Sequence, residues 1–237
     1  MRLDPRLTFE RLVVGAGNRL AAAAARAVAE SPGTTYNPLF VYGGSGLGKT
    51  HILTATAHRL LTLQPEAEVL ALTLDEFSEQ WHAAVSAGET QALGGRLGRA
   101  DLLLIDDIQF LTGRREMQAE LLRLFSAMQD DGRQIVCTSD RPPSEIGDVD
   151  ERLIRRLAGG LVVDVDFPEY EARVAILRSA FFFKIATRAS KFGSCTSVMR
   201  PIANRERRRS SRPGISEGTV SEVITTALLI WWSALNV

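Results

Sequence analysis

The chain has 237 residues, of which 45% are hydrophobic and 24% charged, and its 28 basic side chains balance 28 acidic ones. This length is sufficient for one sizeable hydrophobic core, and the composition excludes a disordered or collagen-like chain. Two cysteines are too few for a disulfide-rich secreted scaffold. The charged start lacks an apolar signal segment, and no apolar run has the length of a transmembrane segment, so the sequence predicts a cytoplasmic protein.

Short apolar runs alternate with amphipathic stretches over residues 1–178, which is typical of a parallel sheet in an α/β fold. In chain order the pattern predicts a helix over 18–30, a strand over 39–42, a helix over 50–63, a strand over 69–73, a helix over 75–86, a strand over 102–106, a helix over 115–130, strands over 135–139 and 161–165, and a helix from 169 onward. We therefore expect a core of five parallel strands covered by helices.

A glycine-rich segment between the first strand and the helix after it fits the phosphate-loop pattern G-x-x-x-x-G-K-[ST] without a mismatch. Its backbone N–H groups are expected to face phosphates, Lys49 to reach the β- and γ-phosphates, and the Thr50 hydroxyl to bind Mg²⁺. Lys49 is the only lysine among the first 178 residues, although arginine is abundant there. The alternative is a glycine-rich turn that binds nothing. The candidate nucleotide-binding residues are Gly43, Gly44, Ser45, Gly46, Leu47, Gly48, Lys49, Thr50 and the adjacent His51.

The apolar strand LLLID ends at Asp106, and a second carboxylate, Asp107, follows directly. We expect Asp106 to hold Mg²⁺ through water and Asp107 to polarise the attacking water. The alternative is an acidic turn that caps the next segment.

Asp140 follows the fourth predicted strand. Polar residues at the carboxyl ends of parallel strands face the ligand crevice, so Asp140 is a candidate sensor of the γ-phosphate. An Asx turn before two prolines is the competing interpretation.

Three arginines occur in the short helical pattern at 151–156, and Arg152 and Arg156, four residues apart, share a face. They are candidates for an arginine finger that completes the ATP site of a neighbouring subunit. The alternative is a solvated basic face that pairs with nearby acidic residues.

The order of these motifs resembles the AAA+ module of the DnaA family of bacterial chromosomal replication initiators. The resemblance rests on the phosphate loop followed by LLLIDDIQFL, TSDRPP and ERLIRRL, and it covers residues 3–178. It implies a three-layer αβα P-loop NTPase core with a five-stranded parallel sheet. It also implies that this core binds ATP or ADP with Mg²⁺ and hydrolyses ATP slowly, as a switch. The module would assemble on origin DNA through single-stranded contacts.

Site roles also follow from the resemblance. Val13, Val14 and Asn18 are expected near the adenine, Asp106 and Asp107 at the Mg²⁺ and hydrolysis positions, and Asp140 at the first sensor. Arg156 corresponds to the finger, through which the chain would self-associate, and Arg152 to its companion.

The resemblance ends at residue 178, and nothing after it is similar to the family's helical lid or to its domain for double-stranded origin boxes. Residues 179–237 carry 9 basic and 3 acidic side chains, whereas residues 1–178 carry 19 and 25. We expect this atypical basic tail to be disordered or the product of a frame shift. The missing lid is expected to leave part of the nucleotide cleft open, which would weaken binding and slow hydrolysis. A tail that binds DNA phosphates is the alternative.

Three functions remain open from the sequence. The chain is expected to be the ATP-binding module of a replication initiator, and the alternatives are a shortened regulator of the initiator and a helicase loader.

Overall fold

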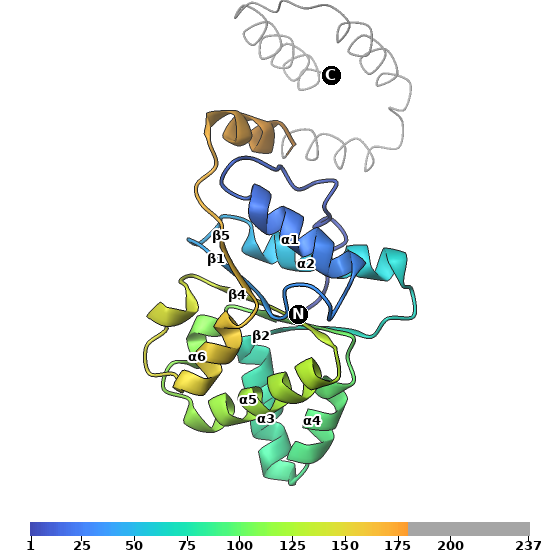
Figure 1. Cartoon of the computed structure of the whole chain (residues 1–237), viewed down its shortest axis with the longest axis vertical. Helices are drawn as coiled ribbons and strands as arrows, with labels where there is room; N and C mark the ends of the chain where they lie inside the picture. Colours follow the sequence, from blue (N-terminus) through green and yellow to red (C-terminus); the bar gives the residue numbers. More distant parts are fainter. Residues whose placement is uncertain (180–237) are drawn as a thin grey trace, which may run out of the picture. The chain divides into compact units, whose positions relative to one another are not determined.

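The computed structural model describes residues 1–179, in which five parallel strands form one sheet (Figure 1). The strands are β1 (Leu39–Tyr42), β2 (Val69–Thr73), β3 (Leu102–Asp106), β4 (Gln134–Ser139) and β5 (Leu161–Asp164). Their order is β2-β3-β4-β1-β5, so β1 lies in the interior of the sheet between β4 and β5. The predicted α/β fold with five parallel strands is confirmed, although the order of the strands was not predicted.

Helices cover both faces of this sheet. They are α1 (Arg19–Glu30), α2 (Lys49–Leu63), α3 (Leu74–Ala87), α4 (Thr90–Gly98), α5 (Arg115–Asp130) and α6 (Glu151–Ala158), with 3₁₀ turns η1 (Ile108–Leu111) and η2 (Pro143–Glu145) and a last described helix over 170–179. In Figure 1, α1 and α2 lie on one side of the sheet and α3 to α6 on the other. The three-layer arrangement expected from the sequence is therefore present.

The core is divided by the sheet into two apolar layers, and β3 contributes to both. Leu103 and Ile105 pack with the buried residues of α5, whereas Leu102 and Leu104 pack with those of α1 and α2. Successive side chains of a strand point to opposite faces, so a central strand between two helical layers must be apolar at every position. This requirement explains why β3 was recognisable as an uninterrupted apolar run.

Helix α4 was not predicted, because its sequence contains Gly94, Gly95 and Gly98, and glycine disfavours the helical backbone. Leu93 and Leu97 are four residues apart and both buried. Their shared apolar face packs in the same core layer as α5, and this packing outweighs the weak local propensity.

Residues Met1–Ala180 form one compact unit. No helix in this described part of the chain is long and apolar enough to cross a membrane. The predictions for the basic tail concern residues that, apart from Ser179, lie outside the described ones.

Candidate nucleotide-binding site

The glycine-rich segment connects the carboxyl end of β1 to the first turn of α2, as the phosphate-loop pattern requires. The backbone N–H of Gly43 donates a 3.2 Å hydrogen bond to the carbonyl of Ser139 in the neighbouring strand β4. Gly43 has φ +153°, and a Cβ atom there would lie 2.2 Å from the carbonyl oxygen of Val165. Gly48, which precedes α2, has φ +95°. Both positions therefore require glycine, the first because of a neighbouring backbone and the second because of its own conformation.

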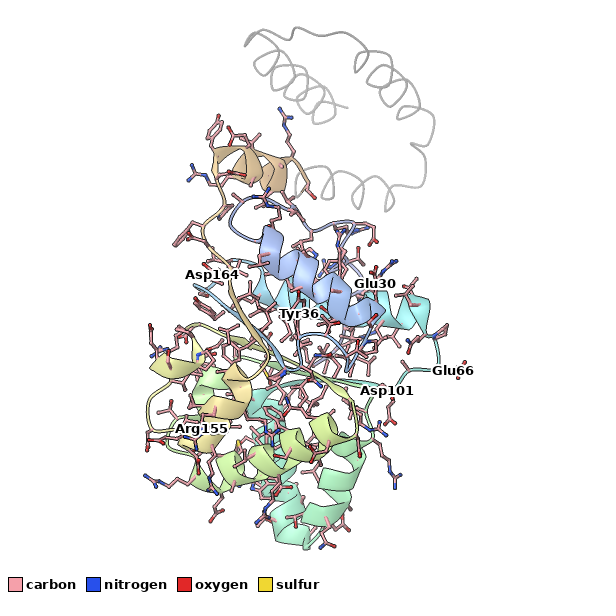
Figure 2. The ribbon with its side chains drawn as sticks, viewed as in Figure 1. Glu30, Tyr36, Glu66, Asp101, Arg155 and Asp164 are labelled. Carbon is pink, nitrogen blue, oxygen red and sulfur yellow. The ribbon has the colours of Figure 1, made fainter. Side chains whose placement is uncertain are left out.

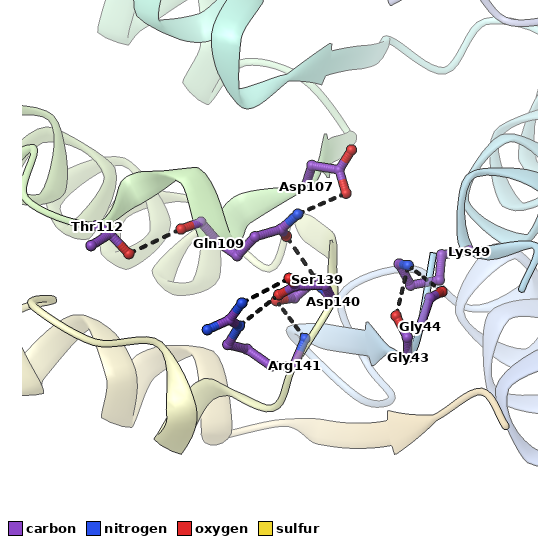
Figure 3. Close-up of polar contacts among 9 residues, drawn as sticks. All are labelled: Gly43, Gly44, Lys49, Asp107, Gln109, Thr112, Ser139, Asp140 and Arg141. Carbon is purple, nitrogen blue, oxygen red and sulfur yellow. Dashed lines mark hydrogen bonds and ion pairs between the residues drawn. The ribbon is translucent and has the colours of Figure 1, made fainter. Parts of the chain in front are cut away.

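Lys49 places a buried ammonium group inside the loop. The residue has an exposed fraction of 8%, and Nζ donates hydrogen bonds of 2.7 Å and 2.9 Å to the carbonyl oxygens of Gly43 and Gly44 (Figure 3). Lys49 has no ion pair with any described residue. The N-terminus of α2 adds a positive potential at the same place. A buried cation that meets only neutral acceptors, beside a helix N-terminus, is suited to bind an anion such as phosphate.

Two oxygen donors suited to Mg²⁺ meet beside this loop. The Thr50 hydroxyl donates a 2.8 Å hydrogen bond to Oδ2 of Asp106, whose side chain is buried at the end of β3. The hydroxyl of Thr138, in β4, donates to the other oxygen, Oδ1. Magnesium in nucleotide sites is commonly held by one or two protein oxygens together with phosphates and water. The described residues contain no group of three or more His, Cys, Asp or Glu side chains that could hold a metal by themselves.

Asp107 and Asp140 lie at the same edge of the sheet, because β3 and β4 are adjacent and parallel. Asp107 has the left-handed conformation (φ 60°, ψ 48°), and its N–H donates a 3.0 Å hydrogen bond to Oγ1 of Thr138. The Asp140 carboxylate accepts hydrogen bonds of 2.8 Å and 2.9 Å from Nε and Nη2 of Arg141. These hydrogen bonds from Arg141 hold the pKa of Asp140 below its usual value. The three predicted carboxylates are thus brought together with the phosphate loop at one edge.

Gln109 links these two residues, and the sequence analysis did not identify it (Figure 3). Its Nε2 donates a 3.0 Å hydrogen bond to Oδ1 of Asp107, and its Oε1 accepts a 3.3 Å hydrogen bond from the N–H of Asp140. Thr138 was also missed. Both residues could have been found from their positions in the sequence. Gln109 follows the aspartate pair by two residues, and Thr138 stands two residues before Asp140.

A small cavity of about 70 Å³ lies between the N-terminal segment and the phosphate loop. It is lined by Val13, Gly15, Gly17, Asn18, Gly46, Leu47, Asp166, Pro168, Ala172 and Ile176. The Asn18 amide shapes the loop that borders this cavity, since Oδ1 accepts from the N–H of Gly15 and Nδ2 donates to the carbonyl of Val13, both at 2.9 Å. Val13 and Asn18 therefore border one cavity, and their contacts with an adenine stay a prediction.

Two further predicted nucleotide contacts are placed differently. Val14 does not line the cavity, and its side chain is 45% exposed. The Nε2 atom of His51 lies 2.9 Å from the carbonyl oxygen of Thr8, so this ring connects α2 to the N-terminal segment. Their contacts with a nucleotide stay predictions.

The two candidate finger arginines lie on α6 and contact none of the phosphate-loop or carboxylate residues within residues 1–179. Arg152 is exposed and forms a 3.0 Å ion pair with Asp150. Arg156 is half-buried, and its guanidinium donates 2.9 Å hydrogen bonds to Oγ of Ser126 and Oε1 of Gln129, both in α5. The role of either arginine at the ATP site of a neighbouring subunit stays a prediction.

Comparisons with known sequences give a consistent result. A family model for the bacterial DnaA ATPase domain matches residues 3–164. A chromosomal replication initiator protein DnaA from Symbiobacterium thermophilum is 47% identical over 176 residues, which are 74% of this chain and 38% of that protein. One from Gloeothece citriformis is 43% identical over 178 residues, or 75% of this chain and 39% of that protein. The chain thus spans well under half the length of these relatives.

Solved structures include similar domains. Domain III of the Thermotoga maritima DnaA superposes with a TM-score of 0.75 at 38% identity, covering 78% of this chain and 77% of that one. A DnaA from Aquifex aeolicus bound to AMPPCP has a TM-score of 0.72 at 32% identity, covering 76% of this chain and 56% of that one. A DnaA bound to AMPPCP and single-stranded DNA gives the same values. The DnaC helicase loader, with a TM-score of 0.54 at 13% identity, shares the fold alone.

Since the family model matches more than half of the chain and the fold agrees with that of solved relatives, the chain belongs to the bacterial DnaA ATPase domain family.

Proposed function

We propose that this chain binds ATP or ADP together with Mg²⁺ and acts as the nucleotide switch of a replication initiator. The observation that carries the proposal is the buried ammonium of Lys49 at the start of α2, next to the Thr50–Asp106 pair. The ammonium and the loop N–H groups from Gly43 to Thr50 would bind the phosphates, and Thr50 and Asp106 would hold Mg²⁺. The bound ion would neutralise charge on the β- and γ-phosphates.

Slow hydrolysis is proposed to depend on Asp107 and Asp140. Asp107 would accept a hydrogen bond from the attacking water and orient it, while Asp140 would respond to the γ-phosphate. The hydrogen bonds from Arg141 lower the pKa of Asp140 and so favour its ionised form, which accepts hydrogen bonds. The adenine would occupy the cavity beside Val13 and Asn18.

Assembly is proposed to use Arg156, with Arg152 as its companion. In a single chain the Arg156 guanidinium is bound to α5, so a neighbouring subunit would have to offer it a stronger partner, such as a γ-phosphate. Single-stranded DNA is the proposed polymer along which the chains assemble. This part rests on the similarity to a DnaA bound to AMPPCP and single-stranded DNA.

Isothermal titration with ATP and ADP, each with and without Mg²⁺, tests the nucleotide site. Binding is expected for the natural chain and lost in Lys49→Ala, because the buried charge that faces the phosphates is removed. Arg59→Ala removes a cation from the same helix that pairs with Glu30 on the surface, and it is expected to bind normally. No binding to the natural chain, or equal binding to Lys49→Ala, would contradict the proposal.

Binding of single-stranded DNA in the presence of AMPPCP or ADP separates the initiator from its alternatives. The initiator module is expected to assemble on DNA by itself and only with AMPPCP. A shortened regulator would require a full-length initiator, and a helicase loader would capture the replicative helicase.

A further inference from the structure

The side chain of Gln109, in η1, lies between two residues proposed to act on the γ-phosphate. Its amide nitrogen donates to the Asp107 carboxylate and its amide oxygen accepts from the Asp140 backbone, at 3.0 Å and 3.3 Å (Figure 3). The Gln109 carbonyl in turn accepts a 3.1 Å hydrogen bond from the Thr112 hydroxyl. The Gln109 side chain thus bridges Asp107 and Asp140, and the turn that carries Gln109 is itself held by a hydrogen bond.

The left-handed conformation of Asp107 makes this bridge possible. With φ 60° and ψ 48°, Asp107 turns the chain sharply from β3 into η1, so that Gln109 points back toward the carboxyl edge of the sheet. Aspartate tolerates this conformation better than most residues, but it still costs energy and commonly marks a functional site. The N–H of Asp107 is fixed by Thr138.

The contacts of Asp107 leave one carboxylate oxygen available. Gln109 holds Oδ1, whereas Oδ2 accepts no hydrogen bond from the described residues. A carboxylate fixed at its backbone and at one oxygen presents the other oxygen in a defined direction. Orientation of this kind is what a group needs in order to position an attacking water.

Only glutamine fits this bridge among the similar side chains. The carboxylate of Asp107 requires a donor and the N–H of Asp140 requires an acceptor, and an amide supplies both. Glutamate keeps the acceptor but sets a second negative charge against Asp107. Asparagine is one methylene shorter and cannot span the same two partners.

We propose that Gln109 is a positioning residue for ATP hydrolysis, which aims the Asp107 carboxylate and ties it to the Asp140 backbone at the end of β4. This inference rests on the proposed function, because it assigns Gln109 to the hydrolysis site described there. Gln109 acts through Asp107 and is expected to contribute little to nucleotide affinity.

The test compares Gln109→Ala and Gln109→Glu with the natural chain. Single-turnover hydrolysis of Mg²⁺·ATP is expected to slow by about tenfold in Gln109→Ala, while ATP affinity changes by less than about twofold. Gln109→Glu is expected to slow hydrolysis at least as much. In ligand-free protein, the backbone amide resonance of Asp140 is expected to shift in Gln109→Ala and to stay close to its natural position in Gln109→Glu, which retains the acceptor.

Gln118→Ala is the matched control. Gln118 is a buried glutamine that also forms a bridge, donating 2.9 Å hydrogen bonds to the carbonyls of Leu111 and Asp148 and accepting from the N–H of Asp150. It holds Leu111 at the end of η1 but contacts neither Asp107 nor Asp140, so its loss reports the effect of loosening this turn while the Gln109 side chain is kept. Thermal unfolding of each variant shows whether it remains folded at the assay temperature.

The inference is overturned if Gln109→Ala hydrolyses ATP at the natural rate, if its affinity falls as much as its rate, or if Gln118→Ala slows hydrolysis equally. An unchanged Asp140 amide resonance in Gln109→Ala would also overturn it. A natural chain that does not bind ATP would refute the proposed function itself. Normal binding with an unchanged rate in Gln109→Ala would refute this inference alone.

Discussion

The hydroxyl of Thr50 donates a 2.8 Å hydrogen bond to the carboxylate of Asp106, although 56 positions separate the two residues. Thr50 lies in α2, the helix that follows β1, and Asp106 is the last residue of β3. Strands β1 and β3 are not neighbours, because β4 lies between them in the sheet. Thr138, in β4, contacts the other oxygen of the same carboxylate. The first turn of α2 and the strands β3 and β4 thus place three oxygen-bearing side chains at one point beside the phosphate loop.

Replacing Thr50 by valine is expected to remove the enhancement of ATP affinity by Mg²⁺, because one of the two proposed metal donors is lost. Thr50→Ser keeps the hydroxyl and should keep the enhancement. Thr50 is exposed, so water can replace the hydroxyl at Asp106, and the free energy of unfolding should fall by only about 1 kcal/mol. Titrations with and without Mg²⁺, together with urea unfolding, measure both effects. A Mg²⁺ enhancement that persists in Thr50→Val would exclude Thr50 as a ligand.

Two glycines of the phosphate loop should differ in their response to alanine. In Gly48→Ala the new Cβ meets no atom within 4 Å, so only the strain of φ +95° remains, about 1–2 kcal/mol. In Gly43→Ala the Cβ would lie 2.2 Å from the Val165 carbonyl, which adds a clash with backbone and raises the loss to about 3 kcal/mol or more. Urea denaturation of the two variants compares them directly. Equal stabilities would show that the contact with Val165 relaxes freely.

Arg141 is expected to control the titration of Asp140. Its hydrogen bonds lower the pKa of the Asp140 carboxyl from the ordinary 3.8, so the ionised form stabilises the folded state. This stabilisation is fully present above pH 3.8 and is lost as the pH falls through the lower, folded-state pKa. In Arg141→Gln the pKa of Asp140 should rise toward 3.8, as measured by a carboxyl ¹³C NMR titration.

The matched control for this titration is Arg152→Gln. Arg152 pairs with Asp150 and lowers the pKa of that carboxyl instead. Its replacement should therefore leave Asp140 unchanged. A pKa of Asp140 that does not move in Arg141→Gln would mean that Arg141 is not its dominant partner.

Arg156→Ala is expected to abolish self-association in the presence of AMPPCP, because the proposed finger would be missing. Arg155→Ala is the control, since Arg155 is an exposed residue of the same helix (Figure 2). Among the described residues its ion-pair partner is Glu151. Sedimentation velocity measures the assembled fraction. Assembly by Arg156→Ala, or equal loss in both variants, would argue against a specific role for Arg156.

Release of Arg156 from α5 gives an independent test. The double variant Ser126→Ala and Gln129→Ala removes both of its hydrogen-bond acceptors within the chain. Assembly should be retained or strengthened, because the guanidinium no longer has to leave these partners. Reduced assembly would show that α5 holds Arg156 in its functional position.

The sequence by itself determined the five strands and the phosphate loop. Both depend on residues that are close together in the chain: an apolar run is sufficient to mark a buried parallel strand, and the loop from Gly43 to Thr50 carries its own glycines, lysine and hydroxyl. The starts and ends of β1, β2 and β3 were therefore predicted to the residue. Helix α4 was missed because its glycines lower the local helix propensity, whereas the burial of Leu93 and Leu97 stabilises it in the folded domain.

The tertiary structure alone decided which distant residues meet. The order of the strands brings Thr50, Asp106 and Thr138 together, and the turn at Asp107 directs Gln109 toward Asp140. The partners of Arg156 depend on how α6 packs against α5. Sequence periodicity reports which face of an element is buried, whereas a hydrogen bond between distant residues depends on strand order, register and side-chain geometry, which the complete packing of the domain determines.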